Sequence, residues 1–83
     1  MNIYVSNLKF TMTEDELKDI FSEFGEVSSA KIITFRDTGR SKGYGFVEMG
    51  DEEGQKAIDA LNGKEIQGRE LRVNIAHERK DRD

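Results

Sequence analysis

One stretch near the middle of the chain, residues 42–49 (KGYGFVEM), constrains the fold most strongly. Side chains alternate between the two faces of a β-strand, so Tyr44 and Phe46 point to one face, and Val47 and Met49 point to the other. The stretch also holds two glycines, which weaken a strand, and the usual reason for them is close approach of a helix or a ligand. A strand that buries valine and methionine yet presents two rings to solvent predicts a surface on which nucleobases stack.

The composition limits the chain to one small domain with little scope for catalysis. Its 83 residues leave room for a single core. Cysteine is absent, which excludes disulfides, thiolate metal sites and cysteine nucleophiles, and one histidine, His77, is too few for a metal site. No apolar run approaches the roughly 18 residues of a membrane span. We therefore expect a soluble, cytoplasmic, monomeric protein with no metal ion, cofactor, membrane contact or small-molecule substrate.

Charge is distributed unevenly along the chain. The net charge of −4 argues at first against a nucleic-acid partner. The two stretches predicted as helices, residues 12–26 and 51–62, hold ten acidic residues and two lysines, a balance of −8. The remaining residues hold eleven Lys or Arg and seven acids, a balance of +4. If the helices share one side of a sheet, the other side is free to bind RNA. The acidic net charge then predicts that the protein adheres only weakly to nucleic acid in a non-specific manner.

Three further stretches, residues 3–8, 27–34 and 71–75, alternate like strands. A bulge near residues 28–29 is an expected irregularity. The side chains expected to face inward are Ile3, Val5, Ala30, Ile32, Leu71, Val73 and Ile75, and those expected to face outward are Tyr4, Lys31, Ile33, Arg72 and Asn74.

Two stretches show helical spacing of apolar residues. Thr13 and Glu16 form a capping box at the start of the first helix, and Gly25 is expected to end it in a left-handed conformation. In the second helix Asp51 is the expected N-cap, and Gly54 costs up to about 1 kcal/mol relative to alanine. The residues expected to be buried are Leu17, Ile20, Phe21 and Phe24 in the first helix and Ala57, Ile58 and Leu61 in the second.

The remaining segments read as connections and a tail. Residues 35–41 have the composition of a loop, and residues 64–69 suggest a small hairpin turning at residues 67–68. Residues 78–83 are charged and have no apolar period, so we expect a frayed tail after a domain of residues 1–77.

The order strand-helix-strand-strand-helix-strand predicts the α+β class. It is typical of a ferredoxin-like βαββαβ sandwich, in which two helices cover one face of a four-stranded antiparallel sheet. The uncovered face should be polar, yet here it would show Tyr4, Ile33, Tyr44 and Phe46. This open aromatic face is the feature that links the fold to function.

Residues 42–49 and 3–8 resemble the two ribonucleoprotein signatures of the RNA recognition motif family, in the family's order. The phrases TEDELKDIFSEFGEV, TGRSKGYGFVEM and ALNG are also similar to family phrases. Met49 replaces an aromatic residue of the pattern, but it faces the core and bears on packing. The chain looks like the single-domain RNA-binding proteins of bacteria, including the cold-inducible cyanobacterial type. The resemblance implies a non-enzymatic protein that handles RNA after transcription or in cold stress.

The resemblance also implies roles for individual residues. Tyr4 and Phe46 look like the main stacking platforms, Tyr44 like the residue that packs between riboses or on a dinucleotide, and Lys42 like a phosphate contact. Asn74 and the backbone around Ala76 and His77 look like the groups that read base edges. The loops could add phosphate contacts from Lys9, Arg36 and Arg40. The remaining predicted RNA-binding positions are the outward-facing Lys31, Ile33 and Arg72.

Phe35 departs from the acidic residue usual in the family. We expect its ring to be buried against the loop, with stacking on an extra base as the alternative.

The expected partner is single-stranded RNA of two to four nucleotides, with single-stranded DNA as an alternative. A different reading is a protein-interaction module that uses the open face or the acidic helix side. A phosphatase-like enzyme would need a glycine-rich loop with an arginine after the first strand, and residues 6–10 have neither. Tyr44 and Phe46 could also be plain strand formers, and Lys42 a solvated lysine.

Overall fold

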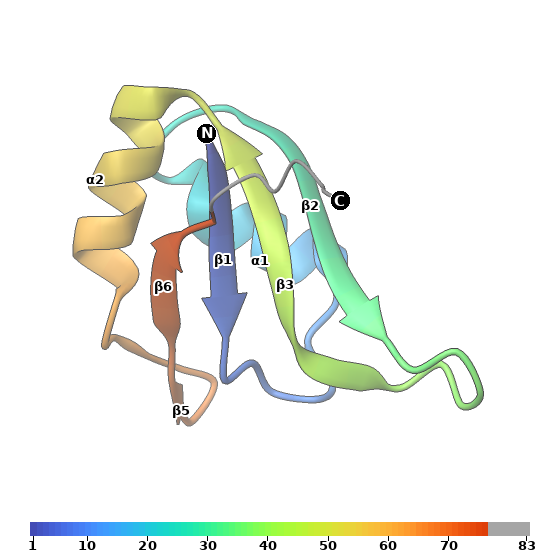
Figure 1. Cartoon of the computed structure of the whole chain (residues 1–83). Helices are drawn as coiled ribbons and strands as arrows, with labels where there is room; N and C mark the ends of the chain where they lie inside the picture. Colours follow the sequence, from blue (N-terminus) through green and yellow to red (C-terminus); the bar gives the residue numbers. More distant parts are fainter. Residues whose placement is uncertain (77–83) are drawn as a thin grey trace.

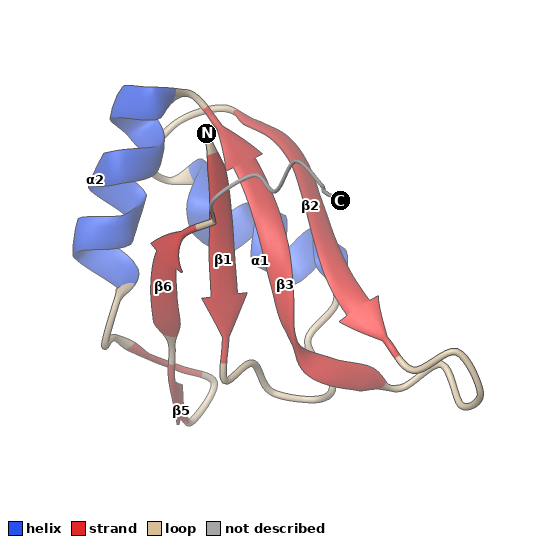
Figure 2. Cartoon of the chain, viewed as in Figure 1, coloured by secondary structure: helices blue, strands red, loops and turns tan. Residues whose placement is uncertain are grey.

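The computed structural model describes residues 1–76 and shows one sheet backed by two helices (Figures 1 and 2). The elements are β1 (Asn2–Ser6), α1 (Glu14–Ser22), β2 (Val27–Thr34), β3 (Ser41–Met49), α2 (Asp51–Leu61), β4 (Glu65–Ile66), β5 (Arg69–Glu70) and β6 (Arg72–Ile75). The main sheet is antiparallel throughout, with the order β2-β3-β1-β6, and β4 and β5 form a separate hairpin. The predicted ferredoxin-like sandwich is confirmed.

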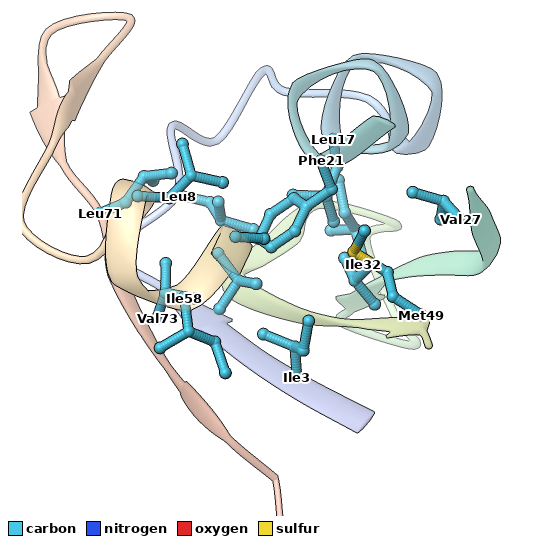
Figure 3. Close-up of a cluster of buried hydrophobic side chains, with 14 of the residues drawn as sticks. Ile3, Leu8, Leu17, Phe21, Val27, Ile32, Met49, Ile58, Leu71 and Val73 are labelled. Carbon is cyan, nitrogen blue, oxygen red and sulfur yellow. The ribbon is translucent and has the colours of Figure 1, made fainter. Parts of the chain in front are cut away.

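The hydrophobic core lies between the sheet and the two helices (Figure 3). Leu17 and Phe21 of α1 are fully buried against the inward side chains of the strands. Because α1 and α2 both contribute to this one cluster, they cover the same face of the sheet. The predicted inward positions are confirmed for Ile3, Val5, Ile32, Val47, Met49, Leu71 and Val73, with Ala30, Ile20 and Phe24 partly buried against the cluster.

Helix α1 begins with the predicted capping box. The Thr13 hydroxyl oxygen accepts a hydrogen bond from the Glu16 backbone N–H (3.2 Å), and the Glu16 carboxylate accepts one from the Thr13 N–H (3.0 Å). The helix is shorter than predicted, since Glu23 is its C-cap. Gly25 has a positive φ, but its value of 157° is far from the left-handed helical region near +57°, so the predicted left-handed cap does not form. A glycine is needed there for room, since a Cβ would collide with the Glu53 side chain of α2.

Helix α2 begins without a side-chain cap. Its N-cap is Gly50, so the prediction of Asp51 is wrong, and Asp51 instead starts the first turn, where the helix dipole favours an acid. Gly54 is buried, and a Cβ on it would lie 2.5 Å from Sδ of Met1 and 3.3 Å from Cδ1 of Ile3. This glycine therefore lets the start of β1 pass close beneath the helix, which compensates for its low helix propensity.

The two glycines of β3 are required for different structural reasons. A Cβ on Gly45 would collide with the Lys31 carbonyl oxygen and lie 3.1 Å from Cα of Ile32, so β2 approaches unusually closely there. Gly43 adopts a φ of 89°, which side chains other than glycine rarely tolerate. The close approach at Gly45 is therefore to a neighbouring strand and not to a helix, and approach of a ligand stays a prediction. The predicted bulge near residues 28–29 is confirmed, and a second register shift lies between residues 32 and 34.

The end of β1 and the exposure of Ile75 differ from the prediction. Strand β1 stops at Ser6 because Asn7 turns the backbone with a φ of 62°. Ile75, expected to face inward, is 45% exposed. It lies opposite Ile3, but as the last residue of an edge strand it has a neighbouring strand on one side only. The predicted hairpin turn at residues 67–68 is confirmed, with φ of 53° and 84°.

Candidate nucleic-acid interface

Three aromatic rings lie together on the face of the sheet opposite the helices. They come from Tyr4 on β1 and from Tyr44 and Phe46 on β3, the two central strands. The ring centroids are 5.6 Å apart for Tyr4 and Phe46, 5.7 Å for Tyr4 and Tyr44, and 6.3 Å for Tyr44 and Phe46. Phe46 is 37% exposed and both tyrosines are half-buried. The prediction that these rings point away from the core is confirmed.

The strand register arranges polar groups around these rings. Lys31 lies opposite Phe46, Phe46 opposite Tyr4, and Tyr4 opposite Asn74, so the four residues form one row across all four strands. The row begins with a cation, continues with two rings and ends with an amide. Such an order can hold a phosphate at one edge, stack bases in the middle and donate or accept hydrogen bonds at the other.

A second row runs beside the first. Tyr44 lies opposite Ser6, and Ser6 lies opposite Arg72. Ile33 is half-buried, and it is not among the residues that pack against the core cluster in the described part of the chain. The register therefore brings four predicted site residues beside the two rings of the first row, namely Lys31, Tyr44, Arg72 and Asn74.

The end of β6 offers less than predicted. The Ala76 backbone N–H donates to the Asn2 carbonyl oxygen at 2.8 Å, so it is engaged in pairing with β1. That Ala76 reads base edges stays a prediction. Its carbonyl oxygen, and not its N–H, would have to make the contact. His77 lies outside the described residues, as does the expected tail of residues 78–83.

The predicted phosphate contacts from loops lie at one end of the sheet and not on its face. Lys9 is exposed in the β1–α1 loop, and Arg36 and Arg40 are exposed in the β2–β3 loop, which extends past the end of the sheet (Figure 1). Hydrogen bonds close this second loop, since the Phe35 N–H donates to the Arg40 carbonyl oxygen at 2.8 Å. Lys42, at the start of β3, places its Nζ 5.2 Å from the centre of the Phe35 ring.

Two exposed phenylalanines lie outside the predicted interface. The expectation that Phe35 is buried against its loop is wrong, because the residue is 51% exposed. The sequence predicts no role for Phe10, yet this residue is 66% exposed, and the Arg69 guanidinium carbon lies 5.9 Å from its ring centre. The sequence signal for an exposed Phe10 is a large aromatic residue in a connecting segment that has neither strand nor helix periodicity.

Other kinds of site are not found among residues 1–76. This part of the chain contains no group of three or more His, Cys, Asp or Glu side chains placed to hold a metal ion. It also contains no helix long and apolar enough to cross a membrane.

A scan against known families decides the assignment. The sequence pattern described as the RNA recognition motif matches residues 3–72. The chain belongs to the RNA recognition motif family. It is therefore a member of a non-enzymatic RNA-binding family, and the resemblance noted from residues 3–8 and 42–49 is confirmed.

Individual relatives agree with this assignment. The chain is 49% identical to a Nostoc protein named "Putative RNA-binding protein RbpA", over 99% of this chain and 81% of the relative. The crystal structure of RNA-binding protein PG1 superposes with a TM-score of 0.92 at 46% identity, covering 98% of this chain and 99% of that one. A Sxl-Lethal protein solved in complex with RNA superposes with a TM-score of 0.89 at 32% identity, covering 96% of this chain and 48% of that one.

Proposed function

We propose that this protein binds two to four nucleotides of single-stranded RNA on the open face of its sheet. The observation that carries the proposal is the row Lys31, Phe46, Tyr4 and Asn74, which aligns a cation, two adjacent rings and an amide across the strands. Stacking is sequence-tolerant because every base has a flat face. The structural similarity to a protein solved with RNA supports the same ligand class.

The residues of this face have separate roles in the proposal. Tyr4 and Phe46 each stack one base, and Tyr44 packs on a ribose or on the adjoining base. Lys31, Lys42 and Arg72 pair with phosphates, while Asn74 hydrogen-bonds to a base edge. Two or three stacked bases at about 1–3 kcal/mol each, with few cations, suggest a dissociation constant no tighter than about micromolar.

Neighbouring residues of β3 allow a matched test. Phe46→Ala should weaken RNA binding at least about tenfold and leave the melting temperature nearly unchanged, because the ring faces solvent. Val47→Ala should do the reverse: it removes core volume, lowers the free energy of unfolding by roughly 2 kcal/mol, and leaves the affinity of the folded protein intact. Fluorescence anisotropy and thermal unfolding measure the two effects. Unchanged binding with a large loss of stability in Phe46→Ala would refute the platform.

A second experiment separates RNA from other partners. Amide shifts of residues 4, 44 and 46 should move when short random RNA pools are added. Parallel titration with the corresponding DNA pools tests whether the 2′-hydroxyl matters. If neither RNA nor DNA moves the amide signals of these residues, the protein-interaction alternative would be favoured. The monomeric state, the cytoplasmic location and the domain limits of residues 1–77 stay predictions.

We further propose that the protein acts on RNA after transcription, cold stress included. Support comes from the likeness to cyanobacterial RNA-binding proteins. Impaired growth of a deletion strain after a temperature downshift, rescued by the wild-type chain but not by Phe46→Ala, is the expected result.

A further inference from the structure

Phe10 and Phe35 line one hollow at the end of the sheet, outside the aromatic face. Phe10 belongs to the β1–α1 loop and Phe35 to the β2–β3 loop, and they are the two most exposed large apolar side chains of the described residues. The hollow has a volume of about 550 Å³ and is also lined by Arg40 and Lys42. Two solvent-exposed rings beside two cations form an amphipathic site and not a core.

The charges around this hollow favour an anionic ligand. Its lining includes no acidic side chain, and Nζ of Lys42 lies 5.2 Å from the Phe35 ring centre. An adjoining hollow of about 410 Å³, which shares Phe10, Gly39 and Ser41 with the first, is lined by Glu14 and Asp15 and would repel phosphate. The electrostatic difference selects the Arg40 and Lys42 side.

Arg69 is held in place beside Phe10 by Asn7. The Arg69 Nη2 donates to Oδ1 of Asn7 at 2.8 Å, and the Asn7 Nδ2 donates to the Glu70 carbonyl oxygen at 2.6 Å. These bonds tie the β4–β5 hairpin to the end of β1. They position a further cation beside Phe10, outside the lining of the hollow, with its guanidinium carbon 5.9 Å from the Phe10 ring centre.

The hollow is continuous with the aromatic face. The Phe10 ring lies beside Gly43, the residue before Tyr44, since a Cβ on Gly43 would be 3.6 Å from Cε1 of Phe10. The β1–α1 loop is joined to β3 here, since the Leu8 N–H donates to the Gly43 carbonyl oxygen at 2.9 Å. A strand of RNA lying over Tyr44 therefore reaches the hollow with its next nucleotide.

We propose that this hollow binds one additional nucleotide of the same RNA strand, with its base against Phe10 and Phe35 and its phosphate at Arg40 and Lys42. The proposal rests on the proposed function, because the aromatic face must hold the neighbouring nucleotides. It adds a subsite, built from two loops and the start of β3, that shares Lys42 with the aromatic face.

The test uses random-sequence RNA pools of three to eight nucleotides and the full chain. For the wild type, the dissociation constant should fall at least about fivefold at one length step, as expected for one stacked base. Phe10→Ala and Phe35→Ala should abolish that step and leave binding of the shorter pools within about twofold. Phe10→Tyr should retain the step and Phe10→Leu should lose it, since only the former preserves an aromatic face.

Two controls separate the possible failures. Phe46→Ala should weaken every length, and Lys64→Ala, which removes an exposed cation outside the hollow, should weaken none. A wild type that binds short pools without any length step, or a Phe10→Ala effect equal at all lengths, would overturn the subsite alone. Absence of binding at every length would overturn the proposed function and the subsite together. Thermal unfolding checks that each variant is folded.

Discussion

Asn7 ends β1 in a left-handed conformation and holds the adjoining hairpin with its side chain. Its φ is 62°, and its amide group bonds to Arg69 and to the Glu70 carbonyl oxygen. Asparagine tolerates this backbone conformation better than most residues with a side chain. One residue therefore provides both the chain reversal and the anchor for the guanidinium beside Phe10.

Substitutions at Asn7 should separate these two contributions. Asn7→Ala loses the hydrogen bonds and strains the backbone, so we expect unfolding to become easier by about 1–3 kcal/mol. Asn7→Gly loses only the hydrogen bonds and should cost about 1 kcal/mol or less. Urea unfolding of both variants measures the difference. A glycine variant less stable than the alanine variant would contradict the role of the positive φ.

At the scale of elements, the pairing of β2 with β3 depends on the missing side chain of Gly45. The β2 backbone between its two register shifts lies where a Cβ would project, with Ile32 Cα at 3.1 Å from that position. Backbone atoms cannot rotate away as a flexible side chain can. The same pairing sets Lys31 opposite Phe46, so the row of the aromatic face depends on it.

Gly45→Ala should therefore be strongly destabilising. We expect a loss of at least about 2 kcal/mol from overpacking, with β2 and β3 forced apart. Gly39→Ala is the control, because nothing lies within 4 Å of its Cβ position and only its φ of 73° opposes the change, at about 1 kcal/mol. Thermal unfolding compares the two. Equal melting temperatures would show that β2 can move away at little cost.

At the scale of the whole molecule, the acidic helices and the cationic sheet face lie on opposite sides. The acidic first turns of α1 and α2 belong to elements packed on the core face, whereas Lys31 and Arg72 border the aromatic rings and Lys42 lies at the start of β3 beside Phe35. An acidic protein can therefore present a locally positive surface to RNA.

The salt dependence of binding should reflect this segregation. If about three phosphates are engaged, the logarithm of affinity should fall against the logarithm of salt concentration with a slope near −2. Lys42→Gln should reduce the slope by about 0.7, the value for one phosphate on a single strand. Lys56→Gln on α2 removes the same charge far from the face and should leave the slope unchanged. Equal effects of both variants would mean that only net charge matters.

The amino-acid sequence by itself determined the order of elements, the capping box at Thr13 and the outward direction of Tyr4, Tyr44 and Phe46. These features follow from local periodicity and local hydrogen bonding, which adjacent residues specify. The family signatures at residues 3–8 and 42–49 added expected RNA-binding roles for individual residues, but not the positions of their side chains in space.

The tertiary structure decided what depends on contacts between distant elements. It exposed Phe35 and Ile75, engaged the Ala76 N–H with β1, and explained Gly25 and Gly45 by the elements packed against them. It also brought Phe10 beside Phe35 from a different loop. No local pattern encodes such proximity, because it arises only when the strands have paired and the helices have packed.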